Sequence, residues 1–202
     1  MHEVNGVPGT RPAFSVKIPY DAPMARERLS RRIEMELRTL DSGTRIVILC
    51  VGTDRSTGDA LGPLVGTELA RSGCPLFDVY GTLEDPVHAV NLEDTLKKIE
   101  KTVSHPFIIA VDASLGQLSS VGCIQFGSGP VRPGAGVNKD LPPVGDIHLT
   151  GIVNVGGFME YFVLQNTRLS LVMKMAHVIA HSLLTAIERC RGAFISFVSP
   201  DG

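Results

Sequence analysis

The sequence has little excess charge of either sign and no long apolar run. Its 202 residues carry a formal net charge of -2, so the charge balance gives no reason to expect nucleic acid or an anionic membrane as a partner. No apolar stretch approaches the roughly 20 residues that span a bilayer, and the first residues lack the charged-then-apolar pattern of a signal peptide. We therefore expect a cytoplasmic protein that binds neither nucleic acid nor membranes.

Paired cysteine motifs are also absent from the sequence. The four cysteines, at positions 50, 74, 123 and 190, contain no CxxC pair and no zinc-knuckle spacing. Cys50 and Cys123 lie in apolar runs, which predicts buried free thiols in a reducing compartment.

Apolar, strand-like runs alternate with helical patterns along most of the chain. We predict strands at 45–51, 77–81, 107–112, 120–127 and 147–155, and helices at 21–40, 58–72, 91–103 and 167–190. Alternation of this kind favours an α/β fold with a mostly parallel sheet covered on both faces. The length suits one domain with a sizeable core.

The two ends of the chain differ in pattern from the middle. Residues 1–20 hold several prolines and glycines without a period, so we expect a flexible N-terminal arm. Residues 21–192 form the predicted α/β domain, and residues 193–202 a C-terminal tail. The Gly/Pro-rich segment 127–146 is longer than most connections, which favours a functional loop.

The segment 50–66, CVGTDRSTGDALGPLVG, follows the first buried strand and combines glycines with charged residues. It lies at the carboxyl end of a parallel strand, where α/β proteins bind ligands. Its glycine spacing fits neither a P-loop nor the dinucleotide fingerprint, and Ser56 lacks the first glycine of a nucleophile elbow. Nucleotide binding is therefore disfavoured.

Two carboxylates remain as candidates for chemistry. Asp59 opens the helix at 58–72, and Asp112 ends the strand at 107–112. If the two strands are neighbours, both acids lie over one edge of the sheet, where one stays protonated while the other acts as a base. Such a pair suits amide hydrolysis, because the base activates water and the acid protonates the carbonyl or the leaving nitrogen. We expect Asp59 to be the base, since the helix dipole favours its anion.

This segment also fits a purely structural pattern. Ser56 and Asp59 match the S-x-x-D capping box, in which Asp59 would only cap a helix. Arg55, Ser56 and Lys139 are candidates for orienting a substrate. His148, joined to the two acids, is the candidate third ligand if the site instead holds a divalent metal.

Two further patterns favour structural roles. His177 and His181 lie one helical turn apart, which suits a shared metal, but their apolar neighbours and the lack of an HExxH glutamate favour a partly buried helix face. The sequence DSGT at 41–44 copies the signature of pepsin-type proteases. It lies between a helix and the entry of a strand, so it indicates a helix stop and a turn.

Several of these motifs, in the same order, resemble the germination protease family of spore endopeptidases. The resemblance spans residues 45–190 and rests on GTDRSTGDALGPLVG, AVDAS and PGAGVNKDLPPVG. The segment VGDIHLTGIVNVGGFMEYFVLQNTRL looks like the smaller YyaC-type sporulation proteins. The wider superfamily includes the nickel-binding hydrogenase maturation proteases, whose HybD-like fold is a three-layer α/β/α sandwich.

The resemblance implies a sporulation-associated peptidase without a cofactor, acting on a protein or peptide such as a spore protein. Asp59 and Asp112 match the two acidic catalytic positions. In the hydrogenase maturation proteases the equivalent acids bind the metal with a histidine, and the segment of His148 is similar, which implies nickel or zinc in that alternative. A second alternative is a non-catalytic sporulation protein that holds a peptide in the same cleft. The oligomeric state and the substrate stay open.

Overall fold

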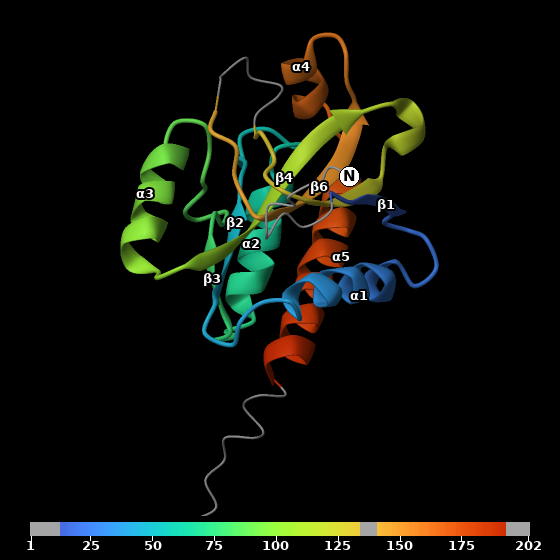
Figure 1. The fold of residues 1–202 in the computed structure, drawn as a ribbon. Helices are drawn as coiled ribbons and strands as arrows, with labels where there is room; N and C mark the ends of the chain where they lie inside the picture. The colour runs from blue at the N-terminus through green and yellow to red at the C-terminus, as the bar shows by residue number, and fades with distance from the viewer. Residues whose placement is uncertain (1–12, 134–140, 193–202) are drawn as a thin grey trace, which may run out of the picture.

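A mixed six-stranded sheet organises the computed structural model of the chain, which describes residues 13–133 and 141–192 (Figure 1). The strands are β1 (Ser15–Pro19), β2 (Arg45–Cys50), β3 (Phe77–Tyr80), β4 (Pro106–Gly116), β5 (Cys123–Ser128) and β6 (Ile147–Val155). Their order in the sheet is β1-β5-β6-β4-β2-β3. Neighbours from β6 to β3 pair in parallel, whereas β5 runs antiparallel to both β1 and β6. The sheet is therefore mixed, with a parallel half around β2 and β4.

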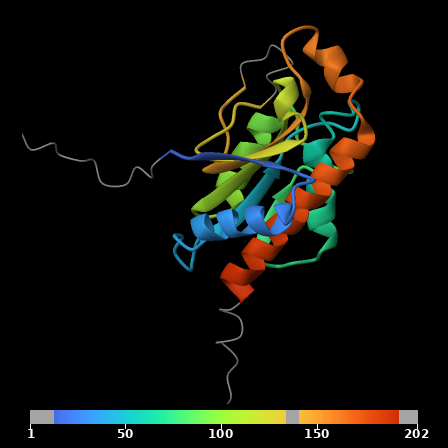
Figure 2. The same cartoon turned by 90° about the vertical axis from the view of Figure 1, so that its right-hand side faces the viewer.

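Helices cover both faces of this sheet (Figures 1 and 2). They are α1 (Ala25–Leu37), α2 (Leu61–Arg71), α3 (Leu92–Thr102), α4 (Glu160–Gln165) and α5 (Leu169–Ile187). Alternate residues of a strand point to opposite faces. Ile46 and Ile48 of β2 accordingly share a core with α1, α2 and α5, and Val47 and Leu49 share a second core with α3. The predicted strands and helices in this part of the chain are confirmed, with small shifts at their ends.

Strand β1 corrects the expectation of a flexible arm over residues 1–20. Residues 15–19 pair antiparallel with β5 over their whole length, and Ile18 is buried in the larger core. The strand forms because β5, far away in sequence, supplies its hydrogen-bond partners, and the local pattern carries no sign of that pairing. Residues 1–12 and the predicted tail at 193–202 lie outside the described residues.

Helix α5 is the main apolar helix of the fold. With the turn that follows it (Leu169–Gly192), it is long and apolar enough to cross a membrane, the one such helix in the described part of the chain. Its buried residues, among them Val172, Ile179 and Leu183, pack in the core shared with β2, α1 and α2. A helix that passes the length test while contributing to a protein core is typical of globular domains.

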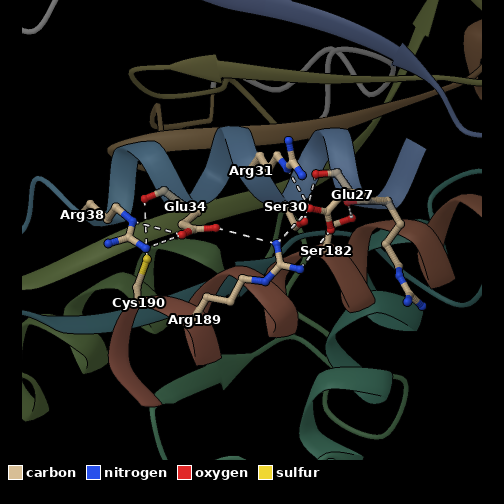
Figure 3. Close-up of polar contacts among 9 residues, drawn as sticks. Glu27, Ser30, Arg31, Glu34, Arg38, Ser182, Arg189 and Cys190 are labelled. Carbon is tan, nitrogen blue, oxygen red and sulfur yellow. Dashed lines mark hydrogen bonds and ion pairs between the residues drawn. The ribbon is translucent and has the colours of Figure 1, made fainter. Parts of the chain in front are cut away.

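Polar contacts join α1 to the end of α5 at the surface (Figure 3). Glu27 of α1 accepts hydrogen bonds from Arg189, at 3.0 and 3.2 Å, and from Arg31, at 2.7 Å. These bonds to Arg189 and Arg31 lower the pKa of Glu27 to about 2. Exposed ion pairs of this kind contribute little to folding stability. The attachment of α1 therefore depends mainly on buried side chains such as Leu29 and Ile33.

The four cysteines are free thiols. Cys50 is buried as predicted, and burial raises the pKa of its thiol. Cys123 is only partly buried, because it lies at the beginning of β5 next to the exposed turn Leu118–Ser120. The prediction of a buried thiol thus holds for Cys50 and not for Cys123.

Glycines bring the backbone of α2 directly against the sheet. A Cβ on Gly62 would lie 2.1 Å from the carbonyl oxygen of Val51, and one on Gly66 would lie 1.9 Å from that of Gly81. Both obstacles are backbone atoms, which cannot rotate aside as a side chain can. The absence of a side chain at these positions therefore sets the distance between α2 and the carboxyl end of β2.

We predict that Gly62→Ala lowers the free energy of unfolding by about 1–3 kcal/mol, the usual cost of overpacking a core. Gly43→Ala is the matched control, since a Cβ there meets no atom within 4 Å. We expect the control to change the free energy by less than about 0.5 kcal/mol, as surface substitutions do. Urea denaturation of both variants measures the difference, and equal values would contradict the close contact.

Candidate active site

A cavity of about 410 Å³ lies at the carboxyl ends of β2 and β4. Five segments line it: the loop between β2 and α2, the turn before α3, the end of β4, α4, and the connection between β5 and β6 at Leu141. The lining residues are Val51, Gly52, Thr53, Arg55, Ser56, Asp59, His88, Ala89, Val90, Asp112, Ala113, Ser114, Leu115, Leu141, Glu160, Tyr161 and Leu164. Ligands bind at this edge of the sheet in parallel α/β folds.

Asp59 and Asp112 both line this cavity. Strands β2 and β4 are parallel neighbours, with Cys50 opposite Val111. Asp112 therefore lies one residue beyond the level at which β2 ends. The prediction that the strand ends at Asp112 is wrong, because β4 continues to Gly116 along β6. The sequence argument required neighbouring strands and a shared edge, and the structure has both.

The loop that carries Asp59 folds back on itself. The N–H of Gly52 donates to the carbonyl of Val87 at 2.8 Å, and the N–H of Thr53 donates to the carbonyl of Asp59 at 3.2 Å. Gly52 has a φ of 148°, and a Cβ there would lie 2.0 Å from the Asp59 carbonyl oxygen. Glycine at position 52 thus permits the contact that fixes the backbone of Asp59.

The capping-box interpretation of Ser56 and Asp59 is wrong. Helix α2 begins at Leu61, its N-cap residue is Ala60, and no side chain caps it. Ser56 takes part through its backbone instead, because its carbonyl accepts the N–H of Ala60 at 3.0 Å. The Asp59 side chain therefore has no structural duty at this helix end and is free to face the cavity.

Burial is the main influence on the pKa of Asp59. Removal from water raises the pKa of Asp59, and the nearby Ser56 hydroxyl opposes this by a smaller amount. We expected the dipole of α2 to favour the anion, but Asp59 precedes the helix and lies in a partly buried position. A carboxyl with a raised pKa is suited to hold and donate a proton, so the assignment of Asp59 as the base is not supported.

Asp112 has a different environment. It is 7% exposed, and its Oδ1 accepts the N–H of Ala113 at 2.8 Å. A hydrogen bond accepted by a carboxylate stabilises its ionised form. Asp112 and Asp59 thus line the same cavity but differ in burial and in hydrogen bonding.

The Ser56 hydroxyl is buried but unpaired. Ser56 is 6% exposed, and within the described residues its Oγ has no hydrogen-bond partner of good geometry. Its effect on Asp59 is therefore that of a nearby dipole. Buried hydroxyl groups are nearly always paired, so this one is available to a bound molecule in the cavity.

The remaining predicted residues have separate outcomes. Arg55 lines the cavity, and its Nε donates to Thr53 Oγ1 at 3.4 Å. Lys139 lies outside the described residues. His148 does not line the cavity. Its Nδ1 lies 2.9 Å from the carbonyl oxygen of Gly129. Its ring also lies against Gly127, where an added Cβ would be 2.8 Å from the ring atoms. The structure therefore does not bring His148 together with Asp59 and Asp112.

Five polar residues of the cavity were missed from the sequence: Thr53, His88, Ser114, Glu160 and Tyr161. The turn of His88 is held by Asn91, whose Oδ1 accepts the His88 N–H at 2.8 Å and whose Nδ2 donates to Pro86 at 3.0 Å. Asn91 is also the N-cap residue of α3, but its side chain binds this turn and does not cap the helix. Glu160 and Tyr161 lie on α4, which is too short for a helical period to reveal.

Helix α4 covers one side of the cavity and is attached to the loop of Asp59. The N–H of Gly58 donates to the carbonyl of Leu164 at 2.9 Å, and a Cβ on Gly58 would lie 2.7 Å from the Leu164 side chain. In Figure 1 α4 lies near the end of the sheet toward which the arrow of β4 points. The loop and α4 thus form two walls that depend on each other.

Comparison with known proteins gives two matches. The family model described as "Protein of unknown function (DUF1256)" matches residues 17–182. The chain is also 63% identical over 142 residues to the "Uncharacterized protein YyaC" of Bacillus subtilis (strain 168), a match that covers 70% of this chain and 69% of that protein. The family match includes every cavity residue that the structure describes.

We predict that Asp59→Asn raises the melting temperature at pH 7. Burial makes the folded-state pKa of Asp59 higher than the unfolded one, so the folded state loses stability as the pH rises through the folded-state pKa. Asparagine removes this cost. Below about pH 3.9, the ordinary pKa of aspartic acid, this cost is absent, so wild type and Asp59→Asn should unfold at similar temperatures. Asp54→Asn, which changes an exposed acid of the same loop, is the control for the loss of a carboxyl group. A lower melting temperature for Asp59→Asn at pH 7 would show that its charge is instead stabilised.

Proposed function

Since the chain belongs to the family described as "Protein of unknown function (DUF1256)", we propose its function from the cavity: it is a peptidase that uses Asp59 and Asp112 as an acid and a base. The observation that carries the proposal is that Asp59, in the loop after β2, and Asp112, in the neighbouring parallel strand β4, line one cavity. Burial raises the pKa of Asp59, and the Asp112 carboxylate accepts a backbone N–H. Paired carboxyl groups in different environments are a recurrent acid and base arrangement.

The proposed reaction uses both acids and a water molecule. Asp112 takes a proton from water as the oxygen attacks the carbonyl carbon, and protonated Asp59 gives its proton to the carbonyl oxygen. When the tetrahedral intermediate collapses, Asp112 returns its proton to the leaving nitrogen, and Asp59 regains one from the hydroxyl group. The C–N bond breaks, and the enzyme ends in its starting protonation state.

The remaining walls of the cavity support a peptide as substrate. Val90, Leu115 and Leu164 supply apolar surface, and Arg55 is the one Lys or Arg among the described lining residues. Tyr161 is 51% exposed, and on the same helix Phe162 is also exposed. A site with apolar walls and a few polar groups suits a segment of polypeptide in extended form. With the resemblance to germination proteases, this supports a spore protein as substrate.

The wider assignment forms part of the same proposal. We place the chain with the germination and hydrogenase maturation proteases, in their three-layer α/β/α fold, and in the cytoplasm of a sporulating cell or forespore. The helices on both faces of the sheet support the fold assignment. No cofactor is required by the proposed reaction.

The metal-dependent alternative does not fit this cavity. It needs a histidine beside the two acids, and His148 lies against Gly127 and Gly129 instead. His88 lines the cavity, but the described residues form no group of three clustered metal ligands there. Nickel and zinc therefore have no part in the proposed reaction.

We predict that Asp59→Asn and Asp112→Asn each reduce peptide cleavage at least about 100-fold, the scale of general acid–base catalysis. Asp54→Asn is the matched control, because Asp54 is exposed in the same loop and does not line the cavity. The assay incubates each protein with small acid-soluble spore proteins and identifies new peptide termini by mass spectrometry. Equal cleavage by all four proteins would refute the proposal. Binding of intact substrate without cleavage by the wild type would favour the non-catalytic peptide-binding alternative.

We also predict a pH profile set by Asp59. Because protonated Asp59 acts as the acid, kcat/KM should fall as the pH rises through its raised pKa. Ser56 lowers that pKa, so Ser56→Ala should move the alkaline limb to higher pH. Thr57→Ala, one residue further along the loop and outside the cavity lining, is the control and should leave the limb in place. A limb that does not move in Ser56→Ala would argue against Asp59 as the titrating acid.

A further inference from the structure

A second group of metal-ligating side chains lies outside the cavity, where α2 meets α5. Glu68 of α2 has its Oε1 2.8 Å from His177 Nδ1 and 3.0 Å from His181 Nε2. The two histidine rings, on α5, have centroids 4.1 Å apart. The three ligand atoms all lie within 4.8 Å of one another, the one such group of three found in the described residues.

The structure changes the interpretation of the two histidines. The sequence favoured a partly buried, apolar helix face, yet the His177 side chain is 59% exposed. The third possible ligand is Glu68, which comes from another helix. Sequence spacing showed the pair of histidines, but only the packing of α2 on α5 shows the carboxylate.

We propose that Glu68, His177 and His181 bind a zinc ion. Two imidazole nitrogens and one carboxylate oxygen are a common zinc ligand set, and histidines four residues apart on a helix face the same side. Ligand atoms 2.0–2.2 Å from a tetrahedral zinc lie about 3.3 Å from one another, which is close to the separations of Glu68 from each histidine. Small side-chain rotations are therefore enough to admit the ion.

The nitrogens that face Glu68 are the ones that a metal ion would use. Each histidine presents one nitrogen to the Glu68 carboxylate, His177 its Nδ1 and His181 its Nε2. On zinc binding each neutral ring keeps its proton on the other nitrogen, His177 Nε2 and His181 Nδ1. Three protein ligands leave a fourth position for water, beside a hollow of about 360 Å³ that Asp21, Lys174 and His177 help to line.

Zinc at this position would join two helices of the larger core. Glu68 belongs to α2, the helix that directly follows the loop of Asp59, and the histidines belong to α5. A ligand that binds only the folded state stabilises it in proportion to its concentration. The ion would thus strengthen the contact of α2 with α5, and this role is independent of the peptidase proposal.

The test is zinc binding to the full chain after removal of metal with a chelator. We expect one zinc ion per chain by calorimetry, and a melting temperature raised by roughly 5–10 °C at a hundredfold excess over Kd. His181→Ala and Glu68→Gln should each weaken binding at least tenfold. His105→Asn is the control: His105 is exposed, lies outside the group, and has a φ of 49° that asparagine tolerates.

Cobalt provides a second measurement that does not depend on stability. Cobalt bound in place of zinc should give the intense visible absorption of a tetrahedral site, and this signal should disappear in His177→Ala. The proposal is overturned if zinc does not bind, or if binding survives in His181→Ala and Glu68→Gln. Binding that is lost instead in Asp112→Asn would place the ion in the cavity and would also overturn it.

Discussion

The parallel pairing of β2 with β4 is the contact on which the cavity depends. The loop that follows β2 carries Asp59, and the second half of β4 carries Asp112, so the two acids meet at the same edge of the sheet. Gly62 and Gly66 hold α2 against the sheet, which restricts the loop between β2 and α2. The backbone of Asp59 is thus positioned by buried contacts of this loop and of α2.

The balance between burial and charge gives the two acids different properties. A helix N-terminus stabilises an anion by about 0.3–1 kcal/mol at exposed sites, and this effect fades within one turn. Asp59 precedes the helix and is partly withdrawn from water, so desolvation dominates. Asp112 is more deeply buried, and its carboxylate accepts a hydrogen bond from the backbone N–H of Ala113. Asp59, in the loop after β2, and Asp112, within β4, therefore lie in different environments although they share one cavity.

Much of this arrangement could be predicted from local pattern. Apolar, β-branched runs identified β2 and β4, and the rule that ligands bind beyond parallel strands identified Asp59 and Asp112. What failed depended on contacts between distant residues. The position of His148 was correct along its strand, but its side chain lies against glycines of the neighbouring segment. Helix α4 was missed because six residues show no period, and Glu68 because only helix packing brings it to the histidines.

The two outer strands of the sheet have a consequence for association between molecules. An unpaired strand edge is a template on which another chain can add, and proteins avoid this with short strands, proline and charge. Strand β1 covers β5 and offers only five residues, with a lysine and a terminal proline. Strand β3, at the other side, has four residues, and its Asp78 is paired with Arg45. Both borders of the sheet thus discourage the addition of strands from other molecules, the first step of fibril growth.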